Sequence, residues 1–461
     1  KEGQSFTYAE FDNAATNIAV MLRSAGVAPG DRVLLVYPPS LDFLVAFIGC
    51  LKASVIAVPV FPPDPRKMRN KMYLFASVAG NSGAKVALTS AVYQFAKKQT
   101  AIKEFLSTKK DATAWPSVRW LVTKISKKNP ASVAGKGGAA AVSDALAPRP
   151  AHSAVAFLQY TSGSTSEPKG VVVSHGNLGH NLKMIMAGLR GEISSVNISW
   201  LPQYHDMGLI GSYLGPLWQG ATGVYLSPFA FVKNPPLWIG VRPFAIAVVV
   251  ASMTSSPPTP HLATHTFNSL RSLGHARAPV SPHARPPAQV LSKYKATHTQ
   301  TPNFGLALAN RKYNTASAKE KARYAPLDLS AIQHVFNAAE PITVDACVSL
   351  RGRCAALRPR RYATPHPSHV APTALSLPPT STTCDETNRI KTKQTTTHNN
   401  RCAAFSATFA EAGFNPASIS AGYGLAEHTV YASDNGKQRL LVDKVSVFYV
   451  PLPITRIVLT V

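Results

Sequence analysis

The stretch from Leu158 to His175, LQYTSGSTSEPKGVVVSH, decides the fold of this chain. It contains or borders two short apolar runs, 154–158 and 171–173, which have the length and composition of buried strands. Seven of the ten residues from Thr161 to Gly170 are Ser, Thr or Gly. Hydroxyls and unhindered backbone N–H groups bind anions, and Lys169 adds a positive charge. The stretch therefore predicts an anion-binding loop between two strands, although its spacing is not that of a Walker A loop.

The residues before this loop alternate between helical and strand patterns. An amphipathic helical pattern covers 8–25. It is followed by predicted elements in alternation: a strand at 32–37, a helix at 41–53, and strands at 55–60, 85–89 and 120–122. The stretch 124–150, rich in Lys, Gly, Ala, Ser and Pro, is predicted to be a surface loop. Strands that alternate with helices predict an α/β fold around a parallel sheet.

Composition excludes several classes of protein. The chain has 461 residues, of which 45% are hydrophobic, so it can build a sizeable core and is not wholly disordered. It contains no apolar run long enough for a transmembrane helix. Its five scattered cysteines include no CxxC pair, which argues against a disulfide scaffold or a zinc site and favours a reducing, cytoplasmic compartment. Cys50, inside an apolar run, is predicted to be a core thiol.

The net charge of +26 invites a nucleic-acid interpretation, but two unusual stretches carry much of it. The stretch 240–290 has eight Pro and four Arg and no Asp, Glu or Lys. The stretch 348–401 has nine basic and two acidic residues. Apart from the apolar run 244–250, neither shows a sustained helix or strand period. We interpret both as insertions foreign to the fold, either disordered or translated from retained introns, and we expect no nucleic-acid partner.

Further motifs follow the predicted loop in a fixed order: WLPQYHDMGLIG at 200–211, SPFAFVKNPPLW at 227–238, TQTPNFG at 299–305, NAAEPI at 337–342 and GYGLAEHTVY at 422–431. With the loop at 161–170, these motifs resemble those of the adenylate-forming (AMP-dependent synthetase) superfamily, and within it the fatty acyl-AMP ligases. The resemblance covers about three-quarters of the chain. It implies the large N-terminal domain of that fold, with parallel and mixed sheets covered by helices.

The resemblance also implies a role for individual residues. ATP phosphates would be bound by the loop residues Thr161, Ser162, Gly163, Ser164, Thr165 and Lys169. Adenine would lie against Tyr423 and Gly424 and be flanked by Ala338, Ala339 and Glu340. Mg²⁺ would be held by Glu427, with Thr165 as the second protein contact. His205 would lie beside the reacting carboxylate, and Met207, Gly208 and Leu209 would begin the wall of the acyl pocket. Lys169, His205 and Glu427 are thus the predicted catalytic residues.

Isolated polar residues in these motifs have simpler interpretations. Asp206 is predicted to cap a helix rather than to act in catalysis. Trp200 and Tyr204 are expected to be core residues rather than ligands.

The predicted reaction joins a long-chain fatty acid to AMP, and the acyl group would then pass to an acyl carrier protein or a polyketide synthase carrier domain. Two alternatives stay open: a fatty acyl-CoA ligase, and a degenerate module that binds acyl groups or nucleotide without catalysis. Because the match fades after Tyr431, we expect residues 1–461 to form an incomplete large domain that lacks the small C-terminal domain. We expect little or no adenylation by these residues alone, and activity in an uninterrupted parent protein.

Overall fold

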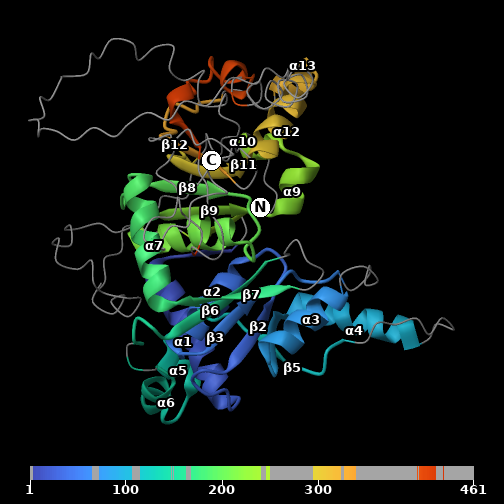
Figure 1. Ribbon diagram of the computed structural model, residues 1–461, viewed down its shortest axis with the longest axis vertical. Helices are drawn as coiled ribbons and strands as arrows, with labels where there is room; N and C mark the ends of the chain where they lie inside the picture. Colours follow the sequence, from blue (N-terminus) through green and yellow to red (C-terminus); the bar gives the residue numbers. More distant parts are fainter. Residues whose placement is uncertain are drawn as a thin grey trace, which may run out of the picture.

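The computed structural model describes two sheets with helices packed around them (Figure 1). The described residues are 4–64, 72–105, 115–146, 148, 150–161, 168–239, 246–249, 294–322, 327–338, 402, 404–421 and 429. The first sheet lies in the lower half of Figure 1 and is built from residues 32–174, whereas the second lies above it. Both sheets are mainly parallel, which confirms the predicted α/β class.

The first sheet has the strand order β5-β4-β2-β3-β6-β7. Its strands are β2 (Arg32–Val36), β3 (Ile56–Pro59), β4 (Val86–Ser90), β5 (Arg119–Thr123), β6 (Val155–Thr161) and β7 (Lys169–Ser174). All neighbours are parallel except β6 and β7, which form an antiparallel pair. The central strand β2, RVLLV, is apolar at nearly every position because helices cover both of its faces.

Four helices belong to this sheet: α1 (Tyr8–Ser24), α2 (Leu41–Lys52), α3 (Met72–Ser82) and α4 (Ala91–Phe105). A capping box between Thr7 and Glu10 starts α1. Helix α2 is buried along most of its length and packs so tightly on α1 that a Cβ atom on Gly49 would lie 2.6 Å from the Cβ of Ile18. This close approach of the two helices requires a residue without a side chain at position 49.

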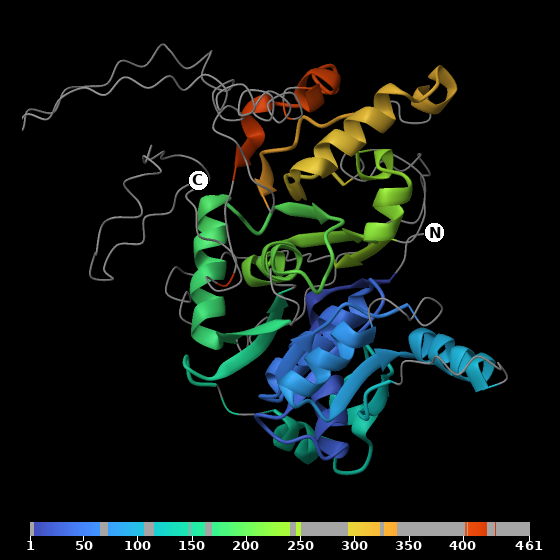
Figure 2. The same ribbon diagram turned by 45° about the vertical axis from the view of Figure 1, so that its right-hand side comes forward.

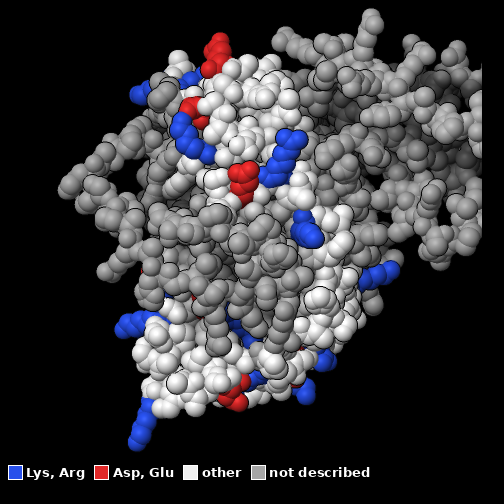
Figure 3. Space-filling view, turned by 90° about the vertical axis from the view of Figure 1, so that its left-hand side faces the viewer, with Lys and Arg blue, Asp and Glu red and all other residues white. Residues whose placement is uncertain are grey.

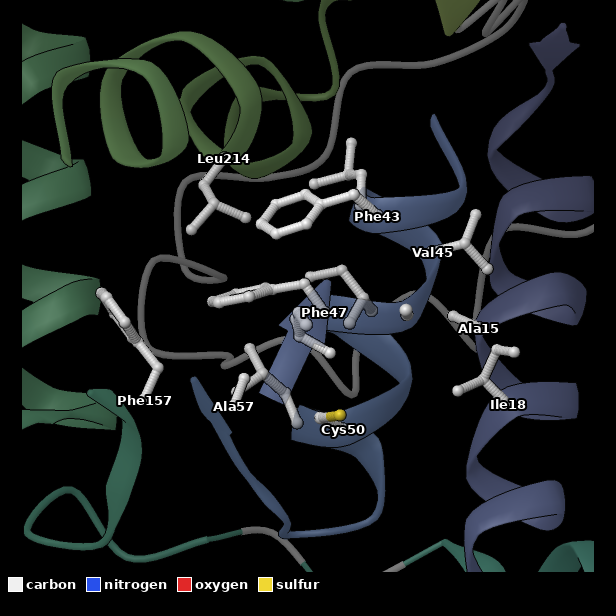
Figure 4. Close-up of a cluster of buried hydrophobic side chains, with 14 of the residues drawn as sticks. Ala15, Ile18, Phe43, Val45, Phe47, Cys50, Ala57, Phe157 and Leu214 are labelled. Atoms are coloured by element: carbon white, nitrogen blue, oxygen red, sulfur yellow. The ribbon is translucent and has the colours of Figure 1, made fainter. Parts of the chain in front are cut away.

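The hydrophobic core of the first sheet includes side chains from a helix that lies beside the second sheet (Figure 4). The ring of Phe47 on α2 lies 6.2 Å from the ring of Phe43 and 5.5 Å from that of Phe157 on β6. Leu214, which comes from a helix beside the second sheet, closes the same cluster. Cys50 is fully buried here, which confirms the predicted core thiol, and burial raises its pKa to about 12.

The second sheet has the order β1-β10-β9-β8-β11-β12-β13. Its strands are β1 (Ser5–Phe6), β8 (Val196–Ser199), β9 (Thr222–Leu226), β10 (Ile246–Val249), β11 (His298–Pro302), β12 (His334–Ala338) and β13 (Ile419–Ala421). The run from β9 through β13 is parallel, so the carboxyl ends of these strands meet at one edge. Ligands of open α/β sheets bind at such edges.

The helices that follow β7 in the described residues lie mainly around the second sheet. They are α7 (His175–Gly188), the π-helix η2 (Met207–Leu214), α8 (Gly215–Gln219), α9 (Pro228–Lys233), α10 (Pro236–Ile239), α12 (Asn303–Asn314), α13 (Ala318–Ala322) and the 3₁₀-helix η6 (Pro416–Ser418). Figure 2 shows α7 standing along one side of the second sheet, directly after β7 of the first sheet. Within the described ranges, none of the helices combines the length and the apolar character that a bilayer crossing needs.

One sequence prediction differs from the structure. The stretch 124–150, predicted to be a loop, contains α5 (Pro130–Ala134) and α6 (Gly138–Ala145), because its small apolar residues form short helices that pack against α1. Within the stretch 240–290, the structure describes only 246–249, which lie in the apolar run 244–250 and form β10 of the second sheet. The rest of 240–290 and all of 348–401 lie outside the described residues, so the insertion hypothesis stays a prediction there.

Figure 3 shows how charged side chains are distributed on the face of the molecule that carries α7. Lys and Arg side chains are scattered over this face, with Asp and Glu side chains among them. Basic and acidic side chains of the described residues are therefore interspersed where this view shows them.

Candidate functional site

The predicted anion loop starts and ends on one antiparallel strand pair. Thr161, the last residue of β6, lies directly opposite Lys169, the first residue of β7. Beneath them, a Cβ atom on Gly170 would lie 2.8 Å from the Cζ of Tyr160, so glycine lets the Tyr160 ring cross the hairpin. The hydroxyl of Tyr160 donates a hydrogen bond to Oδ1 of Asn81 at 2.6 Å. Ser162, Gly163, Ser164 and Thr165 lie outside the described residues, so the structure places only the two ends of the loop.

His205 lies in the turn that connects β8 to the π-helix η2. Its Nδ1 is 2.7 Å from Oδ1 of Asp206, and 53% of its side chain is exposed. The hydrogen bond to Asp206 raises the pKa of His205, although partial burial works in the opposite direction. Oδ1 of Asp206 also accepts the backbone N–H of Met207 at 2.7 Å, which confirms the predicted helix cap. With Nδ1 turned to Asp206, the other ring nitrogen of His205 is the one available to a ligand.

Trp200, earlier in the same turn, is a core residue as predicted. Its ring stacks on that of Phe231 at 3.8 Å with an angle of 8° between the planes, and only 3% of the residue is exposed. Tyr204 is partly buried and packs edge-on against Phe61, with 5.3 Å between ring centroids. Burial raises the pKa of Tyr204 to about 12. Both aromatic residues thus anchor the turn that carries His205.

The helix that follows His205 is wound as a π-helix and is buried throughout. Gly208 must be glycine, because a Cβ there would lie 2.1 Å from the backbone oxygen of Pro202. Met207 packs into the core of the second sheet, whereas Leu209 packs into that of the first. A π-helix is uncommon and is frequent at functional sites. The role of Met207, Gly208 and Leu209 in an acyl pocket stays a prediction.

Two buried glutamines, which the motif analysis did not single out, connect the His205 turn to the first sheet. Nε2 of Gln159 on β6 donates to the backbone oxygen of Tyr204 at 3.0 Å. The side chain of Gln203 bonds to the turn after β2 at Tyr37, Pro38 and Ser40. Gln159 follows an apolar run, and a polar side chain there needs a buried partner. The sequence therefore indicates that Gln159 has a buried hydrogen-bond partner, but it does not identify Tyr204 as that partner.

The predicted adenine-binding residues come at the end of β12 or shortly after β12 and β13 in the sequence, and the structure puts these two strands side by side. Asn337 on β12 pairs with Ala421 on β13 in parallel register, so the segments that follow both strands leave from the same edge. Ala338 ends β12 and is buried. Oδ1 of Asn337 and Oγ of Ser420 are buried and have no hydrogen-bond partner among the described residues. Buried polar atoms without partners at this edge suit a polar ligand.

Several predicted site residues cannot be placed: Ala339, Glu340, Tyr423, Gly424 and Glu427 lie outside the described residues. The shared cleft of Lys169 and Glu427 that the resemblance requires therefore stays a prediction. The two predicted Mg²⁺ ligands, Thr165 and Glu427, also lie outside the described residues. The described part of the chain contains no group of three His, Cys, Asp or Glu side chains placed to bind a metal ion.

Known proteins are similar to this chain in sequence and fold. A medium-chain-fatty-acid–[acyl-carrier-protein] ligase, JamA of Moorena producens, is 30% identical over 343 residues, which are 74% of this chain and 45% of the relative. The long-chain-fatty-acid–AMP ligase FadD32 of Mycolicibacterium smegmatis is 34% identical over 243 residues, covering 51% of this chain and 34% of that protein.

Among solved structures, a fatty acyl-adenylate ligase from L. pneumophila in complex with acyl adenylate and pyrophosphate matches with a TM-score of 0.55 and 26% identity. The match covers 90% of this chain and 49% of that one. The chain thus spans about half the length of the proteins it resembles.

The sequence model of the AMP-binding enzyme family matches residues 1–359. This match agrees with the fold, which is that of the large N-terminal domain of adenylate-forming enzymes, and with the motif order. The chain belongs to the AMP-binding enzyme family, whose members are adenylate-forming enzymes.

Proposed function

We propose that this chain provides the adenylate-forming domain for the activation of a fatty acid to fatty acyl-adenylate, with release of pyrophosphate, for transfer to the phosphopantetheine thiol of a carrier protein or polyketide synthase carrier domain. We expect residues 1–461 alone to show little or no turnover, and an uninterrupted parent protein to be active. The observation that carries the proposal is the hydrogen bond from Gln159 to the backbone oxygen of Tyr204. It holds the His205 turn beside the base of the loop that starts after Thr161. The names of JamA and FadD32 support the choice of a fatty acid.

The chemistry fits the residues that would take part. A fatty acid is already a carboxylate at neutral pH, so the attack needs no general base. One carboxylate oxygen bonds to the α-phosphorus of ATP, and the bond from that phosphorus to the bridging oxygen of pyrophosphate breaks. Catalysis then depends on holding the two anions together and on stabilising the charge of the departing pyrophosphate.

Each residue then has a defined task. Thr161, Lys169 and the loop residues 162–165 hold the β- and γ-phosphates, and His205 orients the carboxylate. Mg²⁺, held by the oxygen ligands Thr165 and Glu427, would neutralise phosphate charge. Adenine lies among Ala338, Ala339, Glu340, Tyr423 and Gly424, and the partnerless oxygens of Asn337 and Ser420 at that edge support a base there.

Two alternatives predict different products. A fatty acyl-CoA ligase makes the same adenylate but transfers the acyl group to CoA. A non-catalytic module binds ATP or an acyl-adenylate mimic and releases no pyrophosphate.

The test measures pyrophosphate release by residues 1–461 and by an uninterrupted parent protein, with ATP, Mg²⁺ and fatty acids of increasing length. Thioester formation by the parent protein is then measured on holo-carrier protein and on CoA. Release that depends on the fatty acid, with thioester on the carrier protein, supports the proposal. Thioester on CoA alone selects the first alternative, and nucleotide binding without release selects the second.

A further inference from the structure

We propose that Gln159 and Gln203 are positioning residues, which hold the turn that carries His205 at a fixed place relative to β6, the strand that ends at Thr161. The inference rests on the proposed function for its catalytic meaning. Its structural content, the immobilisation of His205, can be tested separately.

Gln203 joins the turn to the first sheet through both the nitrogen and the oxygen of its side-chain amide. Nε2 donates to the backbone oxygens of Tyr37 at 3.1 Å and Pro38 at 3.2 Å, and Oε1 accepts the backbone N–H of Ser40 at 3.1 Å. Only 2% of Gln203 is exposed. Because these backbone groups follow β2, the amide fixes the His205 turn to the carboxyl end of the central strand of the first sheet.

Gln159 joins the same turn to β6. Its Nε2 donates to the backbone oxygen of Tyr204 at 3.0 Å, and only 2% of the residue is exposed. Gln159 is two residues before Thr161, and Tyr204 is next to His205. One hydrogen bond therefore connects the backbone beside the predicted carboxylate ligand to the strand that leads into the predicted phosphate loop.

The two attachments act at adjacent residues of one turn and lead to two different strands. A turn held at one point can pivot, whereas a turn held at neighbouring points from β2 and β6 cannot. The packing of Tyr204 on Phe61 adds a third contact on the same side. Displacements of about 1 Å between reacting groups can cost about 100-fold in rate, so such a clamp matters for catalysis.

The experiment replaces each glutamine by methionine, which has a similar length and cannot make these bonds. Gln219→Met, on α8, is the matched control. For each variant we measure the thermal midpoint and the NMR signal and titration of His205. We measure kcat and KM for pyrophosphate release with the same substitutions in an uninterrupted parent protein. We expect both variants to broaden the His205 signal and to lower kcat roughly 10- to 100-fold, with KM for ATP changed less than about twofold. Gln219→Met should leave all three unchanged.

Gln159→Met removes a single bond to the turn and serves as the test if Gln203→Met does not fold. The inference is overturned if both glutamine variants lose thermal stability while the His205 signal and kcat match those of the parent. If the uninterrupted parent protein releases no pyrophosphate, the proposed function fails, but the His205 signal still decides whether the glutamines immobilise the turn.

Discussion

Thr161 and Lys169 lie directly opposite each other on β6 and β7, so the two ends of the loop between them leave the sheet from one point. This pairing brings a hydroxyl and an ammonium group, eight positions apart in the sequence, to the same edge. The loop between them is rich in Ser, Thr and Gly, which is the composition expected of a loop that binds phosphate.

Replacement of Lys169 by Ala should affect ATP use without affecting folding. Its side chain is exposed, so we expect the free energy of unfolding to change by less than about 0.5 kcal/mol. Loss of its charge on the phosphates should lower kcat/KM for ATP about 100-fold or more. Pyrophosphate release and thermal unfolding measure the two effects, with Lys183→Ala on α7 as the control. If the Lys169→Ala and Lys183→Ala variants had equal activity, Lys169 would have no role in binding the phosphates of ATP.

Two glycines of the π-helix should respond differently to alanine. At Gly208 the new methyl group would meet the backbone oxygen of Pro202, whereas at Gly211 no heavy atom lies within 4 Å of the added Cβ. We expect Gly208→Ala to destabilise the fold by about 1–3 kcal/mol. Gly211→Ala should be neutral or stabilise it by up to about 1 kcal/mol. Denaturant unfolding of both variants tests this difference, and similar losses would contradict the packing of the turn.

Local patterns in the sequence predicted the strands of the first sheet and its helices α1 and α2, because these strands contain short apolar runs and these helices have apolar residues at helical spacing. The pattern failed at 124–150, where α5 and α6 are too short for a period to show and depend on contacts with α1. The bond from Gln159 to Tyr204 joins residues 45 positions apart, and no local pattern predicts it. The roles of Lys169 and His205 came from motifs, which identify chemistry but not geometry.

Asp206→Asn should lower the pKa of His205. The carboxylate of Asp206 raises that pKa by its hydrogen bond, and Asn keeps an oxygen for the cap of η2. A raised histidine pKa stabilises the fold at pH values below the unfolded pKa, and the gain is lost as pH rises through the folded pKa. Since His205 is half exposed, the gain should not exceed about 1 kcal/mol. NMR titration of His205 gives the pKa. An unchanged titration would show that Asp206 acts only as a cap.

The histidine pair at the amino ends of β11 and β12 should make the fold sensitive to acid. The rings of His298 and His334 stack at 5.1 Å with 25° between their planes. Burial, together with the charges of His298 and Arg190, lowers the pKa of His334 from 6.5 to about 4. A lowered histidine pKa means that the unfolded chain binds the proton first, so stability falls as pH drops from about 6.5 towards about 4.

His334→Gln should reduce this acid sensitivity. After allowance for solvent screening, we expect the stability lost across that pH range to decrease by roughly 1 kcal/mol. Urea unfolding at a series of pH values measures it, with His180→Gln on α7 as the control. A parallel pH dependence of the parent and His334→Gln would show that the pair does not titrate as argued.

The most direct test of the central claim, that ATP phosphates bind at the loop between Thr161 and Lys169, uses an acyl-phosphate derivative of ATP. Such a compound transfers its acyl group to lysine amines that lie beside the bound phosphates, and mass spectrometry of the digested protein locates the label. We predict labelling of the peptide that contains Lys169, prevented by excess ATP. Labelling confined to surface lysines such as Lys183 and unaffected by ATP would contradict the assignment.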